Sequence, residues 1–518
     1  MSQHRRRAPS SRRWRSPAWA SLTVWSAALF MVAASVARLF TYPPLGSKDE
    51  PAHFDYAVLL WHGRLPVFED GITYAAPFGV EAPVQWVSQH PPLYYAILAP
   101  IVGPLWDAHH PLLAVMAGRG ISALLAGAVV LAAAWAASRC FPGRVRLPGA
   151  TAVTTAFAGM LIQQGSSIYN DVLFVLLCTL ACGVAGAAIR SEVGPRLLVG
   201  ASVVAAAGMA TRLTFVVWLV AIIVSLLVAR SVRLGRLRPI WARVVAAATP
   251  GVAAVVCAGW FYVHNKIDTG NFSGRHAQWG LEHADRVERS FSAVTFDPSF
   301  YTSLFSVYRG ILRPSDPTHW VLMLTPVALA VVWGVVSLLQ RRRAPLPAVP
   351  STSTVPSTSR PWLPAALVVA MLVAVTLLLV VVEIQYVTGG GAPITRYALT
   401  VLEPITLLMA AGLTGSRRLS GVLVTLWVAL AFVPYRTLFD LHVRSIVPDA
   451  AQWVHVAFWV SVVAAAGCVV GGFLDARRRP DASRRPDASR RPDADGPLTV
   501  AGDERPGQPA SASAISDR

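Results

Sequence analysis

Two adjacent carboxylates follow the first long apolar stretch of the chain. Residues 49–54 read Asp-Glu-Pro-Ala-His-Phe, so Asp49 and Glu50 come soon after a segment long enough to cross a membrane. A carboxylate at the edge of a desolvated cavity is a candidate general base, because it can accept the proton of an attacking hydroxyl or amine. A solvated pair of loop charges beside Lys48 is the other interpretation, and these residues alone do not decide between the two.

Further polar residues lie where apolar stretches begin or end. Arginine suits phosphate capture, because its planar guanidinium can donate two parallel hydrogen bonds. Each arginine alone could instead extend toward lipid headgroups. His90 precedes two prolines within residues 91–95, where it could bind a phosphate or an acceptor, or cap a turn. The other members of this polar set are Arg119, Asp171, Arg212, Arg396 and Tyr397.

The elements that must position these residues are membrane helices. Of the 518 residues, 54% are hydrophobic and only 14% are charged, whereas about a quarter of a soluble domain is charged. Runs of about twenty apolar residues can cross a bilayer core of roughly 30 Å, where helices satisfy their own backbone. The sequence predicts an all-α integral membrane protein with about twelve transmembrane helices, near residues 18–40, 116–138, 149–167, 170–189, 197–212, 213–229, 244–263, 320–340, 362–383, 397–413, 419–435 and 452–474.

Basic residues in the short connections predict the orientation, because lysine and arginine accumulate in cytoplasmic loops. With a cytoplasmic N-terminus, the basic connections of this topology all fall on the cytoplasmic side. Residues 91–106 are apolar but short, and a full crossing there would invert every later helix. We therefore expect an interfacial or re-entrant segment on the outer side, and a multi-pass plasma-membrane protein with both termini in the cytoplasm.

This topology divides the chain into a membrane domain and flanking segments. Residues 18–474 form the polytopic domain, with extracytoplasmic loops at 41–117 and 264–319 and a cytoplasmic linker at 341–361. Residues 1–17 are a basic cytoplasmic segment, and the proline- and charge-rich residues 475–518 predict a disordered tail. The net charge of +18 does not indicate nucleic-acid binding, since the arginines lie in short connections and at the termini.

The order of these motifs resembles the GT-C superfamily of membrane glycosyltransferases, in the group that includes protein O-mannosyltransferase-like and aminoarabinose-transferase-like enzymes. The resemblance is clearest over residues 40–215. The Asp-Glu pair matches the acidic motif of the family, and residues 90–95, His-Pro-Pro-Leu-Tyr-Tyr, match the element that ends its first outer loop. Residues 49–54 also resemble a poorly characterised bacterial membrane family thought to share this fold, and in both an Arg-Tyr pair recurs late in the chain.

The resemblance implies a GT-C-like bundle whose large first extracytoplasmic loop contains interfacial helices. It also implies inverting transfer of a sugar from polyprenyl phosphate to an extracytoplasmic acceptor, which could be an envelope glycan, a lipid or a protein. Asp49 would then be the base, Asp171 would orient the base or the acceptor, and Glu50 would be a supporting acid. These three acids could also hold a divalent cation, although the reaction does not demand one and no metal ligands are assigned.

The same resemblance implies a substrate-binding set that holds the donor and its phosphate. A multispanning transporter or lipid flippase is the alternative function, since intramembrane charges fit that class as well. The expected partners are a polyprenyl-phosphate-linked sugar, its acceptor and the lipid bilayer. The substrate-binding residues are His90, Arg119, Arg212, Arg396 and Tyr397.

Overall fold

The computed structural model describes residues 20–47, 49–235, 237–343, 362–391, 394–439 and 445–477. The predicted segment 1–17, the linker from residue 344 onward and the tail from residue 478 onward lie outside the described residues. Within the described ranges every regular element is a helix, as the sequence predicts.

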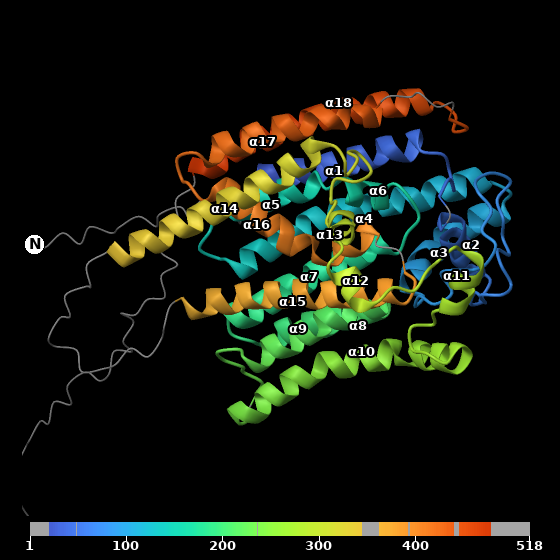
Figure 1. The fold of residues 1–518 in the computed structure, drawn as a ribbon, viewed down its shortest axis with the longest axis horizontal. Helices are drawn as coiled ribbons and strands as arrows, with labels where there is room; N and C mark the ends of the chain where they lie inside the picture. Colours follow the sequence, from blue (N-terminus) through green and yellow to red (C-terminus); the bar gives the residue numbers. More distant parts are fainter. Residues whose placement is uncertain are drawn as a thin grey trace, which may run out of the picture. The chain divides into compact units, whose positions relative to one another are not determined.

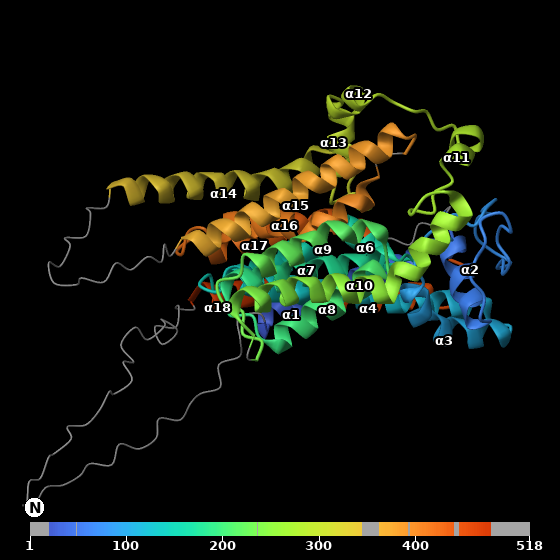
Figure 2. The same cartoon turned by 90° about the horizontal axis from the view of Figure 1, so that it is seen from below.

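Long apolar helices form the body of the molecule (Figures 1 and 2). Two shorter apolar helices, α8 (Pro195–Met209) and α9 (Val216–Leu227), lie among them, and the short helix η2 (Leu213–Phe215) leads into α9. Nine segments of the described chain are long and apolar enough to span a bilayer: α1 (Leu22–Thr41), α4 (Pro111–Cys140), α7 (Asp171–Arg190), α10 (Pro239–Thr269), α14 (Pro317–Arg343), α15 (Leu363–Thr388), η3 with α16 (Thr395–Thr414), α17 with η4 (Ser420–Phe439) and α18 (Ala450–Arg477).

One predicted helix is broken in two. The stretch 149–167 consists of α5 (Leu147–Ala156) and α6 (Gly159–Gly165), so the prediction of one continuous helix there is wrong. The break is stabilised because its backbone groups find other partners: the Tyr435 hydroxyl donates to the Phe157 carbonyl, and the Met160 amide donates to the Val307 carbonyl at 2.9 Å. The segment before α14 therefore packs into the bundle at the α5–α6 break.

Short helices gather at one end of the long ones. Figures 1 and 2 show α2 (Glu50–Trp61), α3 (Leu93–Asp107) and α11 (Ala277–His283) at this end. The α3 helix contains Pro100 and Pro104, packs against α2 and α4, and is not among the candidate spans of the described chain. The second long connection carries α11, α12 (Phe291–Thr295) and α13 (Pro298–Leu304).

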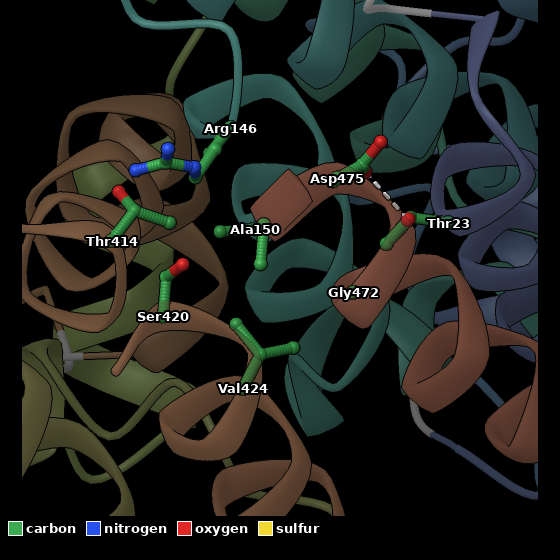
Figure 3. A pocket seen from close by; sticks show the side chains of 9 residues that line it. Thr23, Arg146, Ala150, Thr414, Ser420, Val424, Gly472 and Asp475 are labelled. Carbon is green, nitrogen blue, oxygen red and sulfur yellow. Dashed lines mark hydrogen bonds between the residues drawn. The ribbon is translucent and has the colours of Figure 1, made fainter. Parts of the chain in front are cut away.

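The antiparallel helices α1 and α18 lie side by side along the bundle, and the start of α1 packs against the end of α18 at the other end. Small residues allow the close approach, since a Cβ atom on Gly471 would lie 2.6 Å from the Thr23 backbone nitrogen. Asp475 accepts hydrogen bonds from the Thr23 hydroxyl at 2.6 Å and the Ser21 hydroxyl at 3.2 Å. Figure 3 shows this contact in a small pocket that Arg146 and Ser420 also line. Because α1 runs from this pocket toward residue 49, the two ends of the bundle differ: one carries the Arg146 connection and the other the acidic motif.

Candidate active site

Two acid–arginine pairs meet at a single tyrosine ring. The Arg396 guanidinium donates to the Asp49 carboxylate at 2.8 Å, and the Arg212 guanidinium pairs with the Asp171 carboxylate. The central guanidinium carbons of Arg396 and Arg212 lie 5.5 Å and 5.6 Å from the centre of the Tyr397 ring. The structure therefore gathers these five residues, separated by up to 348 positions in the sequence, into one cluster, which we call the Tyr397 cluster.

Each member of the Tyr397 cluster lies where a helix begins or ends. Asp49 directly precedes α2, and Asp171 is the first residue of α7, where the free amides of a helix start favour a negative charge. Arg212 follows α8 in an extended conformation, and Arg396 with Tyr397 lies in the 3-10 helix η3 (Thr395–Val401). Helix ends on one side of the bundle thus bring distant parts of the sequence together.

Exposure differs across the cluster. The side chain of Asp49 is 30% exposed, whereas that of Asp171 is 3% exposed. Asp49 is therefore the carboxylate that an incoming molecule can reach first, and Asp171 is a buried anchor for Arg212. This difference favours Asp49 over Asp171 as the proton acceptor.

Glu50 and Arg119 form a separate, fully buried ion pair. The Arg119 Nε and Nη2 atoms donate to the two Glu50 carboxylate oxygens at 2.8 Å and 2.7 Å. The remaining guanidinium hydrogens of Arg119 point to the carbonyls of Leu39, Tyr42 and Pro43. Arginine has five N–H donors, and all of them are engaged. Arg119 therefore has no donor left for a phosphate, and we assign it to positioning rather than to the substrate-binding role expected from the sequence.

Glu50 also connects the acidic motif to the start of α7. Its Oε1 atom accepts the Ile168 amide at 3.0 Å, three residues before Asp171. The Glu50 carboxylate is completely buried, so it has no route to a reacting group. Glu50 therefore holds the Asp49 and Asp171 segments in register, which is a structural form of the supporting role expected from the sequence.

A layer of aromatic and histidine rings lies against the Tyr397 cluster. Arg396 is 5.4 Å from the centre of the Tyr169 ring, and the His53 ring is 4.8 Å beyond it. The His53 Nδ1 atom shares a 2.8 Å hydrogen bond with the Tyr95 hydroxyl, and the His90 ring is parallel to the His53 ring at 6.4 Å. His90 thus lies beside the cluster, as the sequence predicts, whereas His53 was overlooked although it belongs to the acidic motif.

Burial keeps both imidazoles neutral. For His53, burial and then the positive charges of Arg396 and Arg212 hold the pKa well below 6.5. For His90, burial and then Arg212 and His53 hold the pKa well below 6.5. Neither ring carries a positive charge at neutral pH, so His90 can offer a phosphate a hydrogen bond but not a charge.

Asp55 links α2 to the first outer loop. It accepts the Tyr74 amide at 2.7 Å and the Gln85 side-chain amide at 2.5 Å. Burial raises the pKa of Asp55 to about 6, and these hydrogen bonds only partly oppose the effect. Since the folded pKa lies above the ~3.9 of an unfolded aspartate, the stabilisation is complete below about pH 4 and is lost as the pH rises through 6.

The first outer loop is therefore expected to open more readily in neutral than in mildly acidic solution. Between pH 5 and pH 7.5 this titration should increase opening of residues 68–86 by about tenfold. Hydrogen–deuterium exchange, corrected for the intrinsic exchange rate at each pH, measures that opening. Asp55→Asn retains an oxygen for the Tyr74 amide and should remove the pH dependence. An unchanged increase in that variant would assign the effect to another group.

The structure adds three site residues that the sequence did not single out. Arg275 donates to the Gly389 carbonyl at 2.7 Å, and its guanidinium carbon is 4.5 Å from the centre of the Tyr386 ring. The Tyr386 ring lies 5.4 Å from the Tyr397 ring. Glu383, one helical turn before Tyr386 on α15, is buried. Glu383 is also the one charged residue of its 26-residue helix, a signal that the sequence does contain.

The acids proposed as cation ligands have other partners. Asp49, Glu50 and Asp171 are each paired with an arginine. Among the described residues, no group of three or more His, Cys, Asp and Glu side chains could hold a metal ion. The arrangement thus offers arginines rather than a carboxylate cage for neutralising a bound anion.

The solved structures that are similar to this chain include those of two enzymes. ArnT from Cupriavidus metallidurans, solved with undecaprenyl phosphate bound, is 14% identical, with a TM-score of 0.44 over 86% of this chain and 75% of that chain. The oligosaccharyltransferase AglB from Archaeoglobus fulgidus, solved with an inhibitory peptide and a dolichol-phosphate, is 12% identical, with a TM-score of 0.39 over 87% of this chain and 56% of that chain. Both are GT-C glycosyltransferases.

This likeness is one of general fold. The aligned part covers only about half of the archaeal oligosaccharyltransferase. No protein-family model matches the sequence, and no curated protein matches it. At these identities and TM-scores the GT-C likeness carries no weight for an activity, and the side chains of the Tyr397 cluster must support any functional conclusion.

Proposed function

We propose that this chain is a membrane glycosyltransferase that moves a sugar from polyprenyl phosphate to an extracytoplasmic acceptor. The observation that supports it is the gathering of Asp49, Asp171, Arg212 and Arg396 around Tyr397. This cluster lies at the end of the bundle away from the Arg146 connection. With the basic connections in the cytoplasm, the cluster faces the other side of the plasma membrane, where an envelope glycan, a lipid or a protein can be the acceptor.

The two arginines of the cluster retain donors for a phosphate. Arg396 uses one guanidinium hydrogen for Asp49, and Arg212 uses one for Asp171. The Arg396 Nε atom is buried without a hydrogen-bond partner among the described residues. Since a guanidinium has five N–H donors, each arginine can keep its carboxylate and still bind a phosphate oxygen. The phosphate of a lipid carrier fits this combination of charge and a position at the ends of the long apolar helices.

Asp49 is placed to take the proton of the acceptor. In the proposed step the acceptor oxygen or nitrogen attacks the anomeric carbon of the sugar, and its proton passes to Asp49. The bond between that carbon and the phosphate oxygen breaks, and the electron pair leaves with the phosphate. Arg212 and Arg396 stabilise the negative charge that develops on this leaving group. Attack opposite the phosphate inverts the configuration of the sugar.

Phosphate affinity tests the roles of the arginines. Arg396→Gln and Arg212→Gln should each weaken binding of undecaprenyl phosphate by about 10- to 100-fold, the effect of losing charged hydrogen bonds. Binding is measured on purified protein in detergent, and Arg417→Gln, on the exposed 415–419 connection, is the matched control. Equal affinity in the control and both cluster variants would contradict phosphate binding at Tyr397.

A transfer assay tests the function itself. Purified protein is mixed with undecaprenyl phosphate carrying radiolabelled glucose, mannose or arabinose, and with cell-envelope extract as acceptor. The expected result is release of undecaprenyl phosphate and label in an acceptor for one of the donors. Movement of an intact labelled lipid across a vesicle membrane, with no release of sugar, would instead indicate a flippase.

A further inference from the structure

Glu383 is a buried carboxylate that the proposed reaction does not use. It lies on α15, five residues before the helix ends at Thr388, which is about 7.5 Å along the axis. The residue is 5% exposed, and its Oε2 atom is enclosed without a hydrogen-bond partner. No hydrogen bond joins either carboxylate oxygen to another described residue. A buried carboxylate without donors is strongly destabilising, so a donor from a bound molecule would stabilise Glu383.

Glu383 belongs to the part of α15 that faces the Tyr397 cluster. The helix packs against α7, whose first residue is Asp171, and against η3, which carries Arg396 and Tyr397. One turn after Glu383, the Tyr386 hydroxyl accepts a hydrogen bond from the Tyr397 hydroxyl at 3.4 Å. Glu383 therefore lies at the level of the cluster, one helical turn deeper in the bundle than the Tyr386–Tyr397 pair.

The arginines of the Tyr397 cluster do not satisfy this carboxylate. The Arg212 guanidinium donates to Asp171, and the Arg396 guanidinium donates to Asp49. Glu383 thus presents acceptor oxygens for which the described residues supply no donor. A bound molecule that carries hydrogen-bond donors would complete this site.

The phosphate, the polyprenyl chain and the sugar of the proposed donor differ in the hydrogen-bond donors that they carry. An ionised phosphate offers acceptor oxygens, and a polyprenyl chain offers neither donors nor acceptors. Only the sugar carries several hydroxyl donors. An ionised glutamate accepts hydrogen bonds but cannot donate them, so the sugar hydroxyls are its complement.

We propose that Glu383 accepts hydrogen bonds from hydroxyl groups of the sugar that is transferred, and so contributes to the choice of sugar. This inference rests on the proposed function, because it requires a sugar donor at the Tyr397 cluster. It assigns different residues of the site to different parts of the donor. Arg212 and Arg396 bind the phosphate, and Glu383 accepts hydrogen bonds from the sugar hydroxyls.

Two affinities measured on the same variants separate sugar recognition from phosphate binding. Glu383→Ala should raise the KM for the active undecaprenyl-phosphate sugar by about 10- to 100-fold, and Glu383→Gln, which keeps one acceptor oxygen, by less. Affinity for undecaprenyl phosphate without a sugar should change less than threefold in both. Glu403→Gln is the matched control, since Glu403 is another buried carboxylate of the bundle with an unpartnered oxygen.

Deoxy donors test the same contact without changing the protein. Removing the hydroxyl that donates to Glu383 should raise the KM of the wild-type enzyme about as much as Glu383→Ala does. The same deoxy donor should change the KM of Glu383→Ala only slightly. Glu383→Gln, which keeps nearly the shape of glutamate, serves in this comparison if Glu383→Ala fails to insert.

Four results would overturn the inference. An equal loss of affinity for the sugar-free carrier would mean that Glu383 acts on the phosphate through Arg212. An unchanged KM in Glu383→Ala, or deoxy donors that are all used as well as the full sugar, would exclude contact with a hydroxyl. A wild-type protein that uses no labelled donor would contradict the proposed function, and this inference with it. A wild-type protein that transfers sugar, together with Glu383 variants of unchanged KM, would contradict this inference alone.

Discussion

Asp49→Asn is expected to slow sugar transfer by about 10²- to 10⁴-fold, the range for loss of a general base. Asparagine has nearly the shape of aspartate and can still accept the hydrogen bond from Arg396, so the Tyr397 cluster should keep its geometry. What it loses is the ability to take a proton from the acceptor. The measurement is the initial rate of label transfer at saturating donor, with protein amount and membrane insertion matched to the wild type.

Controls separate the loss of a base from the loss of a charge. Asp70→Asn, on an exposed part of the first outer loop, should transfer sugar at the wild-type rate. Undecaprenyl phosphate should bind Asp49→Asn at least as tightly as the wild type, because Arg396 then has no carboxylate to compete with the phosphate. Full transfer activity in Asp49→Asn would remove the proposed base, even if the donor binds as expected.

The sequence predicts that these motifs lie at one end of the bundle, as the structure shows, but it does not predict how they pair. Counting helices between basic connections places Asp49, Asp171, Arg212 and Arg396 at one end, because each crossing reverses the chain. Which acid meets which arginine depends on how helix ends approach in three dimensions. Residues 49 and 396 are 347 positions apart, and no local pattern joins them.

Arg119 and Glu383 illustrate two different limits of prediction from the sequence. An arginine near the end of an apolar stretch has the same sequence signature whether it reaches lipid headgroups or is enclosed by three carbonyls, so the buried role of Arg119 could not be predicted. Glu383 did have a signal, since it is the lone charge in residues 363–388. It was overlooked because the motifs that resemble GT-C enzymes lie elsewhere. The break between α5 and α6 depends on Tyr435 and Val307, which are far away in sequence.

Breaking the Glu50–Arg119 pair is expected to destabilise the fold rather than to remove a catalytic step. Loss of one partner of a fully buried ion pair costs about 3–5 kcal/mol, because the other charge stays buried without compensation. In Arg119→Leu, Glu50 would lose both guanidinium contacts, and the Leu39, Tyr42 and Pro43 carbonyls would lose their donors. The free energy of unfolding in detergent, followed by tryptophan fluorescence, measures the effect.

The transfer rate then separates positioning from catalysis at Glu50. Glu50→Gln should lower the free energy of unfolding toward the same range, whereas Glu81→Gln, on the exposed outer loop, should leave it unchanged. Because the Glu50 carboxylate also holds the Ile168 amide, the surviving folded protein should transfer sugar more slowly through a looser Asp171 segment. The decline should be smaller than in Asp49→Asn, with the same pH profile as the wild type. A variant with wild-type stability and no transfer would make Glu50, against its complete burial, a participant in the chemistry.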